Sequence, residues 1–418
     1  MDDVLVVGGG PAGLLSAWLA RQGGAKVRLV AAGIGSTHIM PGWLGIANAA
    51  AEEGAQGDDL PAGIAALAGE HPGHPYAVAG LDALRAGIAA LQEICEASGL
   101  RYRGGLERNM RLPTALGAAL PAAYAPESFV AGDLNGGGAM LIAGPAGWRD
   151  FHPALIAGNL ARQGFAAEPF AFDLPEIHAV KFDNLGTGLA RLFDRPDVRE
   201  RVGKQIAAHL NGAARVGLPA VLGLDAYPAA WQHLQELIGV PVFEIPTLPP
   251  SVPGIRLFNA FKGALTRARV PLLFNMPVAR GLVDGRRVTG IAVTNVVRET
   301  IYRGQHLILA TGGLYGGGIT SDPAGALSEV VLGLPVHFSQ PFAAWFGQAL
   351  LGADHPIHQA GILVNREMQP VDRAGGEPLY DNVRVAGRLV AGYNGVSEGS
   401  TEGAWLATAA RAVSSLLA

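Results

Sequence analysis

The sequence has 418 residues, of which 49% are hydrophobic and 16% are charged, and its formal net charge is -4. This length and composition predict a globular protein large enough for two domains, and the absence of a basic run argues against nucleic acid as a partner. No apolar run approaches the roughly eighteen residues that span a bilayer, and the single cysteine, Cys95, excludes a disulfide within the chain and an all-cysteine iron–sulfur cluster.

The first thirty residues predict a nucleotide-binding unit. Asp3–Val7 is a short apolar run typical of a strand in a parallel sheet, and Lys26–Ala31 predicts a second strand. Between them, Gly8-Gly9-Gly10-Pro11-Ala12-Gly13 opens an amphipathic helix, Leu14–Gln22. The spacing Gly-x-Gly-x-x-Gly allows a tight turn, the close approach of a phosphate, and close packing of helix on strand. We therefore expect a nucleotide cofactor to be held by this turn, through Gly8, Gly10, Pro11, Ala12 and Gly13.

The residues after the second strand leave the kind of nucleotide open. Dinucleotide sites usually have an acidic residue about twenty positions beyond the glycine turn, where it holds a ribose hydroxyl, but here Ala31 and Ala32 stand at that place. FMN, or a dinucleotide held in another way, are both compatible with this. The loop that follows leaves the carboxyl end of a strand, and we expect its residues Ser36, Thr37 and His38 to face the cofactor ring.

The middle of the chain changes pattern near Leu100 and predicts a second domain. The loop Thr247–Arg256 contains three prolines, which fix its shape before a helix that is expected from about Leu257 to Arg269. Arg256 could hold a substrate phosphate through its planar guanidinium, or it could cap carbonyls beneath the rigid loop. Helices are expected at Leu81–Ser98, Phe151–Gln163, Asn184–Phe193, Val198–Leu210 and Pro228–Ile238, and strands at Ala139–Ala143, Val216–Leu222 and Val240–Ile245.

The last part of the chain repeats the opening pattern of strand, glycine loop and helix. A predicted strand, His306–Ala310, runs into Thr311-Gly312-Gly313. Asn382–Ala386 predicts another strand, Gly387–Gly403 a glycine-rich loop, and Ala404–Leu417 an amphipathic helix. Further short strands are expected at Leu272–Asn275, Ala279–Asp284 and Arg287–Asn295. We expect cofactor contacts from these loops at Thr311, Gly312, Gly313, Gly387, Gly399 and Gly403.

Taken together, Gly8–Gly13, Ala310–Gly313 and Asn382–Gly403 resemble the two-domain flavoprotein fold shared by the glutathione reductase and succinate dehydrogenase relatives. A narrower resemblance, nearly from end to end, is to the B subunit of anaerobic glycerol-3-phosphate dehydrogenase. It is carried by His74-Pro75-Tyr76, by the proline loop Leu248–Leu257, and by Val385-Ala-Gly-Arg-Leu-Val-Ala-Gly392.

This resemblance implies an α/β protein with a Rossmann-like flavin-binding domain of the glutathione reductase type and an inserted α+β substrate or cap domain. The flavin-binding domain is expected at residues 1–60, 251–335 and 376–418, and the cap domain at residues 61–250 and 336–375. The implied function is that of a flavin-dependent oxidoreductase subunit that passes electrons from glycerol 3-phosphate towards quinone. Its implied partners are the catalytic A subunit and the iron–sulfur C subunit of that dehydrogenase, and its implied flavin is FMN, with FAD as the alternative. The expected location is the cytoplasm, with contact to the inner membrane only through a partner.

Several residues keep alternative interpretations open. Glu398 and Glu402 stand where glycine and small residues are expected, and two carboxylates near a flavin would disfavour an anionic reduced ring. Arg256 and His38 are the candidate catalytic residues, and no catalytic base is identified. His38 resembles the position of the histidine that bonds covalently to flavin in succinate dehydrogenase relatives, and a hydrogen-bonded loop histidine is the alternative. His74 is expected to anchor its own loop.

Two other functions are compatible with the sequence. One is a self-sufficient flavin oxidase or dehydrogenase that acts on a small hydroxy or amino compound, and the other is a flavin-free scaffold within a complex. We expect no metal site, because His355 and His358 are far in sequence from any cluster of cysteines or carboxylates.

Overall fold

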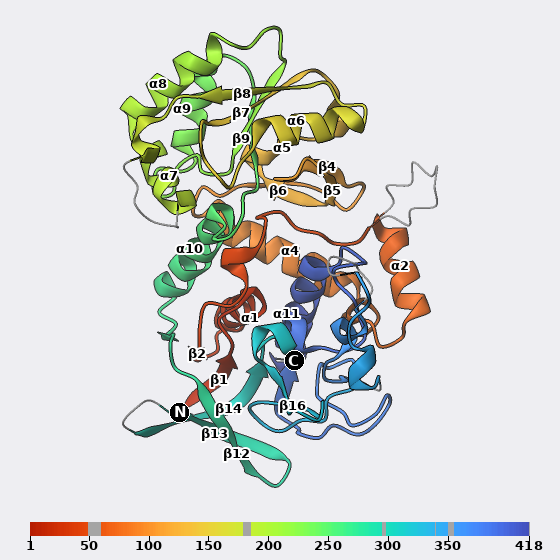
Figure 1. Ribbon diagram of the computed structural model, residues 1–418. Coiled ribbons are helices and arrows are strands. Elements are labelled where there is room, and N and C mark those ends of the chain that lie inside the picture. The colour runs from red at the N-terminus through yellow and green to blue at the C-terminus, as the bar shows by residue number, and fades with distance from the viewer. Residues whose placement is uncertain (49–59, 179–184, 295–297, 339, 350–354, 418) are drawn as a thin grey trace. The chain divides into compact units, whose positions relative to one another are not determined.

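The computed structural model describes residues 1–48, 60–178, 185–294, 298–338, 340–349 and 355–417 (Figure 1). The chain divides into two compact units: unit 1 is Met1–Ser36, Gly45–Ile94 and Phe261–Ala418, and unit 2 is Thr37–Leu44 and Cys95–Ala260. The expected start of a helix at Asn184 and the expected end of a strand at Asn295 lie outside the described residues. Among the helices that are described, none is both long and apolar enough to cross a bilayer.

Within the described residues, unit 1 is built on a seven-stranded sheet in the order β11-β2-β1-β14-β13-β12, with β17 also paired to β14. Strands β11, β2, β1, β14 and β17 run parallel, and β13 and β12 extend the sheet antiparallel. Because β1 lies between two neighbours, its residues Val4–Val7 are all buried. The strands are β1 (Asp2–Val7), β2 (Val27–Val30), β11 (Leu272–Leu273), β12 (Val278–Asp284), β13 (Arg287–Thr294), β14 (Glu299–Leu309) and β17 (Val383–Val385).

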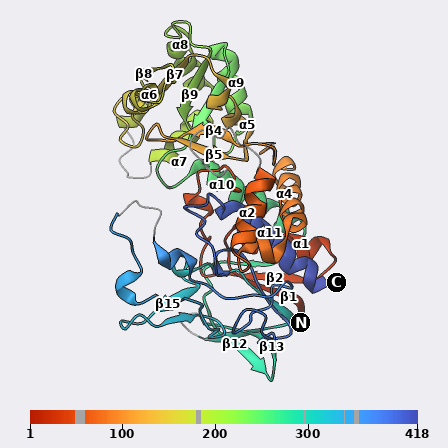
Figure 2. The same ribbon diagram turned by 90° about the vertical axis from the view of Figure 1, so that its right-hand side faces the viewer.

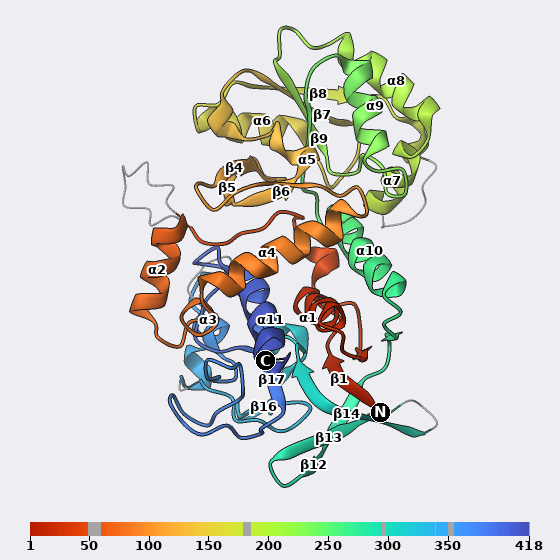
Figure 3. The same cartoon turned by 180° about the vertical axis from the view of Figure 1, so that it is seen from behind.

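Helices α1 (Pro11–Gln22) and α11 (Thr401–Leu417) pack against each other beside this sheet, as Figures 1 and 3 show. The small helix α3 (Pro75–Ala79) packs on α11, and α2 (Leu60–Glu70) packs on α3. A short antiparallel pair, β15 (Ile319–Ser321) and β16 (Leu327–Glu329), lies outside the main sheet. The division between the two units falls within α4 (Leu81–Glu96) and α10 (Val252–Arg267).

Unit 2 has a parallel sheet of its own, with the order β10-β9-β7-β8. Because parallel crossovers are right-handed, a step from β7 to β8 and a return step past β7 to β9 put their helices on opposite faces. Figures 2 and 3 show this arrangement, with α6 on one side of the sheet and α8 and α9 on the other. The elements are β7 (Met140–Pro145), α6 (Pro153–Arg162), β8 (Ala167–Phe172), α7 (Leu185–Phe193), α8 (Pro196–Ala207), β9 (Arg215–Pro219), α9 (Ala229–Ile238) and β10 (Val242–Ile245).

Two antiparallel strand pairs complete unit 2. β3 (Tyr102–Gly104) pairs with β6 (Tyr124–Pro126), and β4 (Met110–Pro113) pairs with β5 (Ala119–Ala122). The short helix α5 (Glu127–Val130) follows β6 directly and packs on β10. The core of unit 2 is aromatic and aliphatic, and its largest fully buried members include Phe151, Phe172, Phe193 and Phe243.

The two units differ in extent from the domains expected from the sequence. Residues 61–94 and 336–375 were expected in the cap domain, but they belong to unit 1. The physical reason is that α3 packs against α11, and that the N–H of Ile362 donates to the carbonyl of Leu389, beyond β17. These segments therefore share contacts with the C-terminal loop and helix rather than with the parallel sheet of unit 2.

Candidate functional site

The parallel strands of unit 1 bring three of the predicted glycine segments to one edge of the sheet. Val7 at the end of β1 is in register with Val30 and with Leu309, and Leu309 is in register with Val385. The turn Gly8–Gly10, the segment Ala310–Gly313 and the residues Ala386–Gly387 therefore all leave the sheet at its carboxyl edge. Open parallel sheets bind their ligands at this edge.

The glycines of the first turn are present for different structural reasons. Gly8 has φ +129°, and a Cβ there would overlap the carbonyl of Ala310; a Cβ on Gly13 would overlap the carbonyl of Gly8. Gly10 has an ordinary φ of -79°, and the nearest heavy atom to a Cβ placed there is the Cα of Gly35, 3.8 Å away. Packing thus requires Gly8 and Gly13, whereas Gly10 leaves open space at the N-terminus of α1. No side chain caps this helix start, where Pro11 is the first residue.

One further feature marks this edge as a place for a polar ligand. The hydroxyl oxygen of Thr311 is buried and has no hydrogen-bond partner within the described residues. A buried hydroxyl without a partner costs free energy, so a ligand atom that pairs with it would be stabilised. Gly387 has φ +70°, its N–H donates to the hydroxyl of Thr408 at 2.9 Å, and a Cβ there would overlap the side chain of Ala12. Gly387 is therefore needed for the close approach of its own segment to α1.

The loop after β2 lies directly on the glycine turn. A Cβ on Gly9 would overlap the carbonyl of Gly33, and one on Gly35 would overlap the backbone of Gly10. Close packing on the glycine turn therefore explains why Gly35 is a glycine. Ser36 ends the first segment of unit 1, and Thr37 and His38 belong to unit 2. The cofactor contacts expected for Ser36, Thr37 and His38 stay a prediction.

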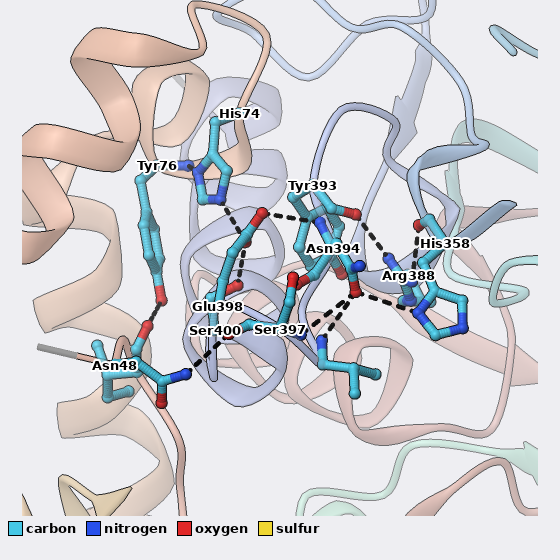
Figure 4. Close-up of polar contacts among 12 residues, drawn as sticks. Asn48, His74, Tyr76, His358, Arg388, Tyr393, Asn394, Ser397, Glu398 and Ser400 are labelled. Atoms are coloured by element: carbon cyan, nitrogen blue, oxygen red, sulfur yellow. Dashed lines mark hydrogen bonds and ion pairs between the residues drawn. The ribbon is translucent and has the colours of Figure 1, made fainter. Parts of the chain in front are cut away.

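The C-terminal glycine loop is organised around Glu398, as Figure 4 shows. Its carboxylate accepts hydrogen bonds from the N–H of Asn394 at 2.8 Å, from the hydroxyl of Ser400 at 2.7 Å and from Nε2 of buried His74 at 3.1 Å. Nδ1 of His74 accepts from the N–H of Tyr76 at 3.0 Å, so the ring proton is on Nε2. The expectation that His74 anchors its own loop is confirmed, and its second partner, Glu398, was not foreseen.

The same loop holds the chain segment Gly45–Asn48. The N–H of Asn48 donates to the carbonyl of Glu398 at 2.7 Å, and its side-chain amide donates to the carbonyl of Ser397 at 2.8 Å. The N–H of Gly403 donates to the carbonyl of Gly45 at 3.0 Å, and the hydroxyl of Tyr76 donates to the carbonyl of Ile46. These hydrogen bonds hold the Gly45–Asn48 segment against Tyr76 and the C-terminal loop, which are far from it in the sequence.

Packing of neighbouring segments against the C-terminal loop explains why Gly399 and Gly403 are glycines. A Cβ on Gly399 would overlap the side chain of Asn48, and a Cβ on Gly403 would overlap the hydroxyl of Tyr76. These contacts explain both glycines without a ligand. Their expected contacts with a cofactor stay a prediction, as do those of Gly312 and Gly313 after β14.

The two carboxylates of the loop have pKa values shifted in opposite directions. Burial opposes ionisation of Glu398, but hydrogen bonds from His74, Ser400 and Asn394 outweigh it and lower the pKa. Burial raises the pKa of Glu402 to about 7, against the lowering effect of the N–H of Gly45, which donates to Oε2 at 3.1 Å. Glu402 lies in the first turn of α11. The charge at this helix start therefore changes near neutral pH.

Arg388 is a second organising residue that the sequence did not single out for a role. Its guanidinium donates to the carbonyl of His358 at 2.7 Å and to that of Tyr393 at 3.3 Å, and it lies over the Tyr393 ring at 4.7 Å (Figure 4). Nδ1 of His358 lies 3.1 Å from the side-chain oxygen of Asn394. Among the described residues, no group of three or more potential metal-binding side chains is found, here or elsewhere.

Arg256 lies in a buried network of unit 2. Its guanidinium makes two bonds to the Glu244 carboxylate, at 2.7 and 3.0 Å, and its Nε donates to the carbonyl of Gly223 at 2.9 Å. The Tyr227 ring lies 4.1 Å from the guanidinium, and Ser128 donates to Glu244 at 2.7 Å. The guanidinium fork is thus already paired with an internal carboxylate, which favours the structural alternative; the substrate role of Arg256 stays a prediction. A lone glutamate in the apolar strand Val242–Ile245 was the sequence signal for this pair.

His38 lies in a short 3-10 helix, Thr37–Ile39. Its ring makes an edge contact with Phe258 at 5.2 Å, and burial lowers its pKa. The Nε2 atom is buried and has no hydrogen-bond partner within the described residues. The expected alternative, a hydrogen-bonded loop histidine, is thus not seen at Nε2, and a role in catalysis or in flavin attachment stays a prediction.

Comparison with known proteins identifies the family. The profile of the FAD binding domain family matches residues 3–403. A protein of Halobacterium salinarum, named as the probable B subunit of anaerobic glycerol-3-phosphate dehydrogenase, is 31% identical over 97% of this chain and 96% of its own length. The chain belongs to this B-subunit family, within the FAD binding domain family. A further B subunit, from Pectobacterium atrosepticum, is 29% identical over 99% of this chain and 98% of that protein.

Family membership confirms the resemblance found in the sequence and the α/β flavoprotein fold. A solved flavocytochrome c3 fumarate reductase in an open conformation is also similar, with 11% identity, coverage of 100% of this chain and 78% of that one, and a TM-score of 0.46. The family description names FAD, so the match supports a flavin but gives no support to FMN. The relatives are named as one subunit of a complex, which implies partner subunits.

The residues at the carboxyl edge of unit 1 fit a flavin nucleotide. The uncapped start of α1, the open space at Gly10 and the unpartnered hydroxyl of Thr311 are what a phosphate-bearing ligand requires. An acidic residue for the ribose is missing after β2, at Ala31 and Ala32, so an adenosine ribose would be held by other groups.

Proposed function

We propose that this chain is the flavin-bearing B subunit of an anaerobic glycerol-3-phosphate dehydrogenase, and that it binds FAD noncovalently in unit 1. The observation that supports this most is membership of the B-subunit family over nearly the whole chain. The geometry of the carboxyl edge adds a physical basis, because an uncapped helix start and a buried hydroxyl without a partner in the described residues lie at an edge where Gly10 leaves room for a ligand.

The proposed reaction oxidises the secondary alcohol of glycerol 3-phosphate to the ketone of dihydroxyacetone phosphate. Two electrons and two protons leave the alcohol: the C–H hydrogen leaves as a hydride, and the hydroxyl proton goes to a base. A bound flavin supplies the two-electron acceptor, from which the electrons pass towards quinone. Within this chain, the start of α1 would hold the phosphates of the cofactor, and Glu398 would fix the loop that precedes α11.

The proposed assembly contains a catalytic A subunit and an iron–sulfur C subunit. Because this chain has one cysteine, Cys95, it cannot hold an all-cysteine iron–sulfur cluster itself. Electrons that leave the flavin would therefore pass to a cluster on a partner, and any contact with the inner membrane would be made through that partner. Cys95 is buried, and burial raises the pKa of its thiol, so it is not a reactive group in this scheme.

Anaerobic mixing of the flavin-loaded chain with glycerol 3-phosphate, with and without the catalytic A subunit, tests the proposal. Bleaching of the flavin absorbance only after that partner is added is the expected result. Bleaching by the isolated chain would instead mean a self-sufficient dehydrogenase. A chain that binds no flavin, yet is needed for activity of the complex, would be a scaffold. Either of these results contradicts the proposal.

A further inference from the structure

Unit 1 exposes three large aromatic side chains in two segments of the chain. Tyr315, Phe342 and Phe346 are 66%, 59% and 56% exposed, respectively. Single apolar side chains are common on protein surfaces and need no explanation, whereas aromatic side chains that gather in one place mark interaction sites. What these three side chains do therefore depends on whether they form one surface.

Ring contacts join Tyr315 to Phe346 through two histidines. The Tyr315 ring makes an edge contact with the ring of His358, and the two ring centroids are 5.5 Å apart. His358 in turn contacts the ring of His355 at 5.5 Å, and His355 contacts the ring of Phe346 at 5.8 Å. The exposed side chains of the two segments are thus continuous with each other.

A small core supports these rings. Buried Trp345 contacts the ring of Phe342 at 4.8 Å and packs with Ile357 and Ala360. The turn between β15 and β16 lies against Phe342, because a Cβ on Gly325 would be 3.1 Å from that side chain. Five side chains are presented on this support, and together they form what we call the aromatic surface: Tyr315, Phe342, Phe346, His355 and His358.

The aromatic surface lies beside the edge at which we propose that the flavin binds. Tyr315 is four residues beyond Thr311, so their Cα atoms are at most about 14 Å apart. Arg388 connects the two places, because a Cβ on Gly313 would be 3.0 Å from its carbonyl and its guanidinium donates to the carbonyl of His358 at 2.7 Å. A protein bound to the aromatic surface would therefore be near the flavin.

The chain around the aromatic surface is poor in basic residues. Residues 304–365 contain no lysine or arginine, whereas Asp322, in the turn that packs on Phe342, is exposed and forms no ion pair within the described residues. Its Oδ1 accepts from the N–H groups of Ala324 and Ala326 at 2.9 and 2.8 Å, which fixes the carboxylate in place. Surfaces that bind anionic lipid carry lysine and arginine, so this chemistry favours a protein with a cation opposite Asp322.

We propose that the aromatic surface is the docking site for the iron–sulfur partner subunit. The inference rests on the proposed function, in which electrons leave the flavin for a cluster that this chain cannot hold, since Cys95 is its only cysteine. The relatives are named as one subunit of a complex, which implies a surface for a partner. The partner should present an apolar patch to Phe342 and Phe346, with a lysine or arginine opposite Asp322. Docking here brings the cluster close to the flavin.

Calorimetric titration of the flavin-loaded chain with the purified iron–sulfur subunit tests this surface. Phe342→Glu and Phe346→Glu each put a charge into the apolar contact, and we expect each to weaken binding about tenfold or more. Ile301→Glu, at a 47% exposed position of β14 where this strand pairs with β13, is the control and should bind like the parent. Unchanged affinity in both phenylalanine variants, or an equal loss in the control, would overturn the proposal.

Asp322→Asn tests the charge of the partner. Asparagine keeps an oxygen that can accept from Ala324 and Ala326, so the turn is retained while the charge is removed. We expect affinity for the iron–sulfur subunit to fall about two- to fivefold at low salt, and the difference from the parent to disappear at about 1 M salt, where exposed charges are screened. Equal affinity of Asp322→Asn and the parent at low salt would contradict a basic partner residue opposite Asp322.

Hydroxyl-radical footprinting of the unsubstituted protein identifies what covers the surface. Tyr315, Phe342 and Phe346 should be labelled in the isolated chain and protected by the iron–sulfur subunit. Protection already present in the isolated chain, or protection by the catalytic subunit alone, by a second copy of the chain or by vesicles of anionic phospholipid, would overturn the proposal. If the iron–sulfur subunit binds while these residues stay labelled, the docking surface alone is wrong; if neither subunit binds the chain, the proposed assembly is wrong as well.

Discussion

Glu244 in unit 2 and Glu398 in unit 1 are both carboxylates enclosed by hydrogen-bond donors, but the donors differ. Glu244 is fully buried and faces the guanidinium of Arg256, with Ser128 and the N–H of Leu222 as neutral donors. The Glu398 side chain is 16% exposed and receives hydrogen bonds from His74, Ser400 and Asn394, with no arginine or lysine among them. One network cancels a charge deep in a core, and the other disperses a charge along a loop.

The two networks serve the protein in different ways. The Glu244–Arg256 pair joins β10 to α10 inside unit 2, so loss of the pair should lower the free energy of unfolding. The Glu398 network joins the Gly45–Asn48 segment, His74 and the C-terminal loop of unit 1, the unit in which we propose that the flavin binds. Loss of this network should lower the free energy of unfolding less than loss of the Glu244–Arg256 pair does, and it should also weaken flavin binding. Substitutions in each network separate these two roles.

The largest effect is expected for Arg256→Met. The substitution leaves the Glu244 carboxylate buried without its cation, which should lower the free energy of unfolding by about 3–5 kcal/mol. Urea unfolding measures this, with exposed Arg162→Met as the control. In the double variant Glu244→Met with Arg256→Met, much of the lost stability should return, because no isolated charge is left.

The opposite result would support the substrate-binding role that the sequence allowed for Arg256. If Arg256→Met unfolds like the parent but binds glycerol 3-phosphate more weakly, Arg256 is a substrate ligand and its ion pair with Glu244 is not structural.

A smaller effect is expected for Glu398→Gln. The side-chain amide of glutamine would face the donors of Asn394 or His74, and about 1–3 kcal/mol of stability should be lost at pH 7. Because the pKa of Glu398 is lowered on folding, its contribution is present above the unfolded pKa and is lost as pH falls through the folded pKa. The difference between parent and variant should therefore shrink below about pH 4.

Urea unfolding between pH 3 and pH 7 tests this prediction, with exposed Glu93→Gln as the matched control. A difference between parent and Glu398→Gln that stays constant over this range would mean that the charge of Glu398 contributes nothing. A loss of flavin affinity that accompanies the loss of stability would place the network next to the cofactor.

An effect of the opposite sign is expected for Glu402→Gln. Its pKa is raised on folding to about 7, so the folded state prefers the neutral acid, and stability falls as pH rises from the unfolded pKa towards 7. Glutamine removes this penalty, so the variant should be more stable than the parent by about 1–3 kcal/mol at pH 8. At pH 4 the two should unfold alike.

Thermal unfolding at these two pH values is the measurement, again with Glu93→Gln as the control. An equal change at both pH values would contradict a raised pKa of Glu402. In the flavin-loaded protein, we expect Glu402→Gln to raise the midpoint potential of the flavin when it is measured at pH values above 7. The reason is that a nearby carboxylate disfavours a reduced flavin that carries negative charge.

The parts of the fold that were predictable follow from local rules. The turn Gly8–Gly13 between a buried strand and a helix is dictated by backbone geometry, and the structure places it as expected. The strand that leads to Thr311 is likewise defined by its apolar run and the glycines after it. Periodicity also predicted α11, although the helix begins at Thr401 and not at Ala404.

The side-chain partners were not predictable, because tertiary packing selects them. Glu398 and His74 are separated by 324 positions, and no local pattern joins them. Gly399 was expected to contact a cofactor, and its packing against Asn48 is visible only once both segments are placed.

The most direct test of flavin binding in unit 1 is the flavin content of Gly10→Ala. Gly10 has an ordinary backbone conformation and space for a Cβ, so the variant should fold with an unchanged melting temperature in the absence of flavin. The added methyl group would occupy the space through which a phosphate approaches the start of α1. Parent and variant are incubated with FAD or FMN, and the bound flavin is released and identified by mass spectrometry. We expect FAD on the parent and little flavin on the variant; equal flavin on both, or none on the parent, would contradict a flavin at this edge.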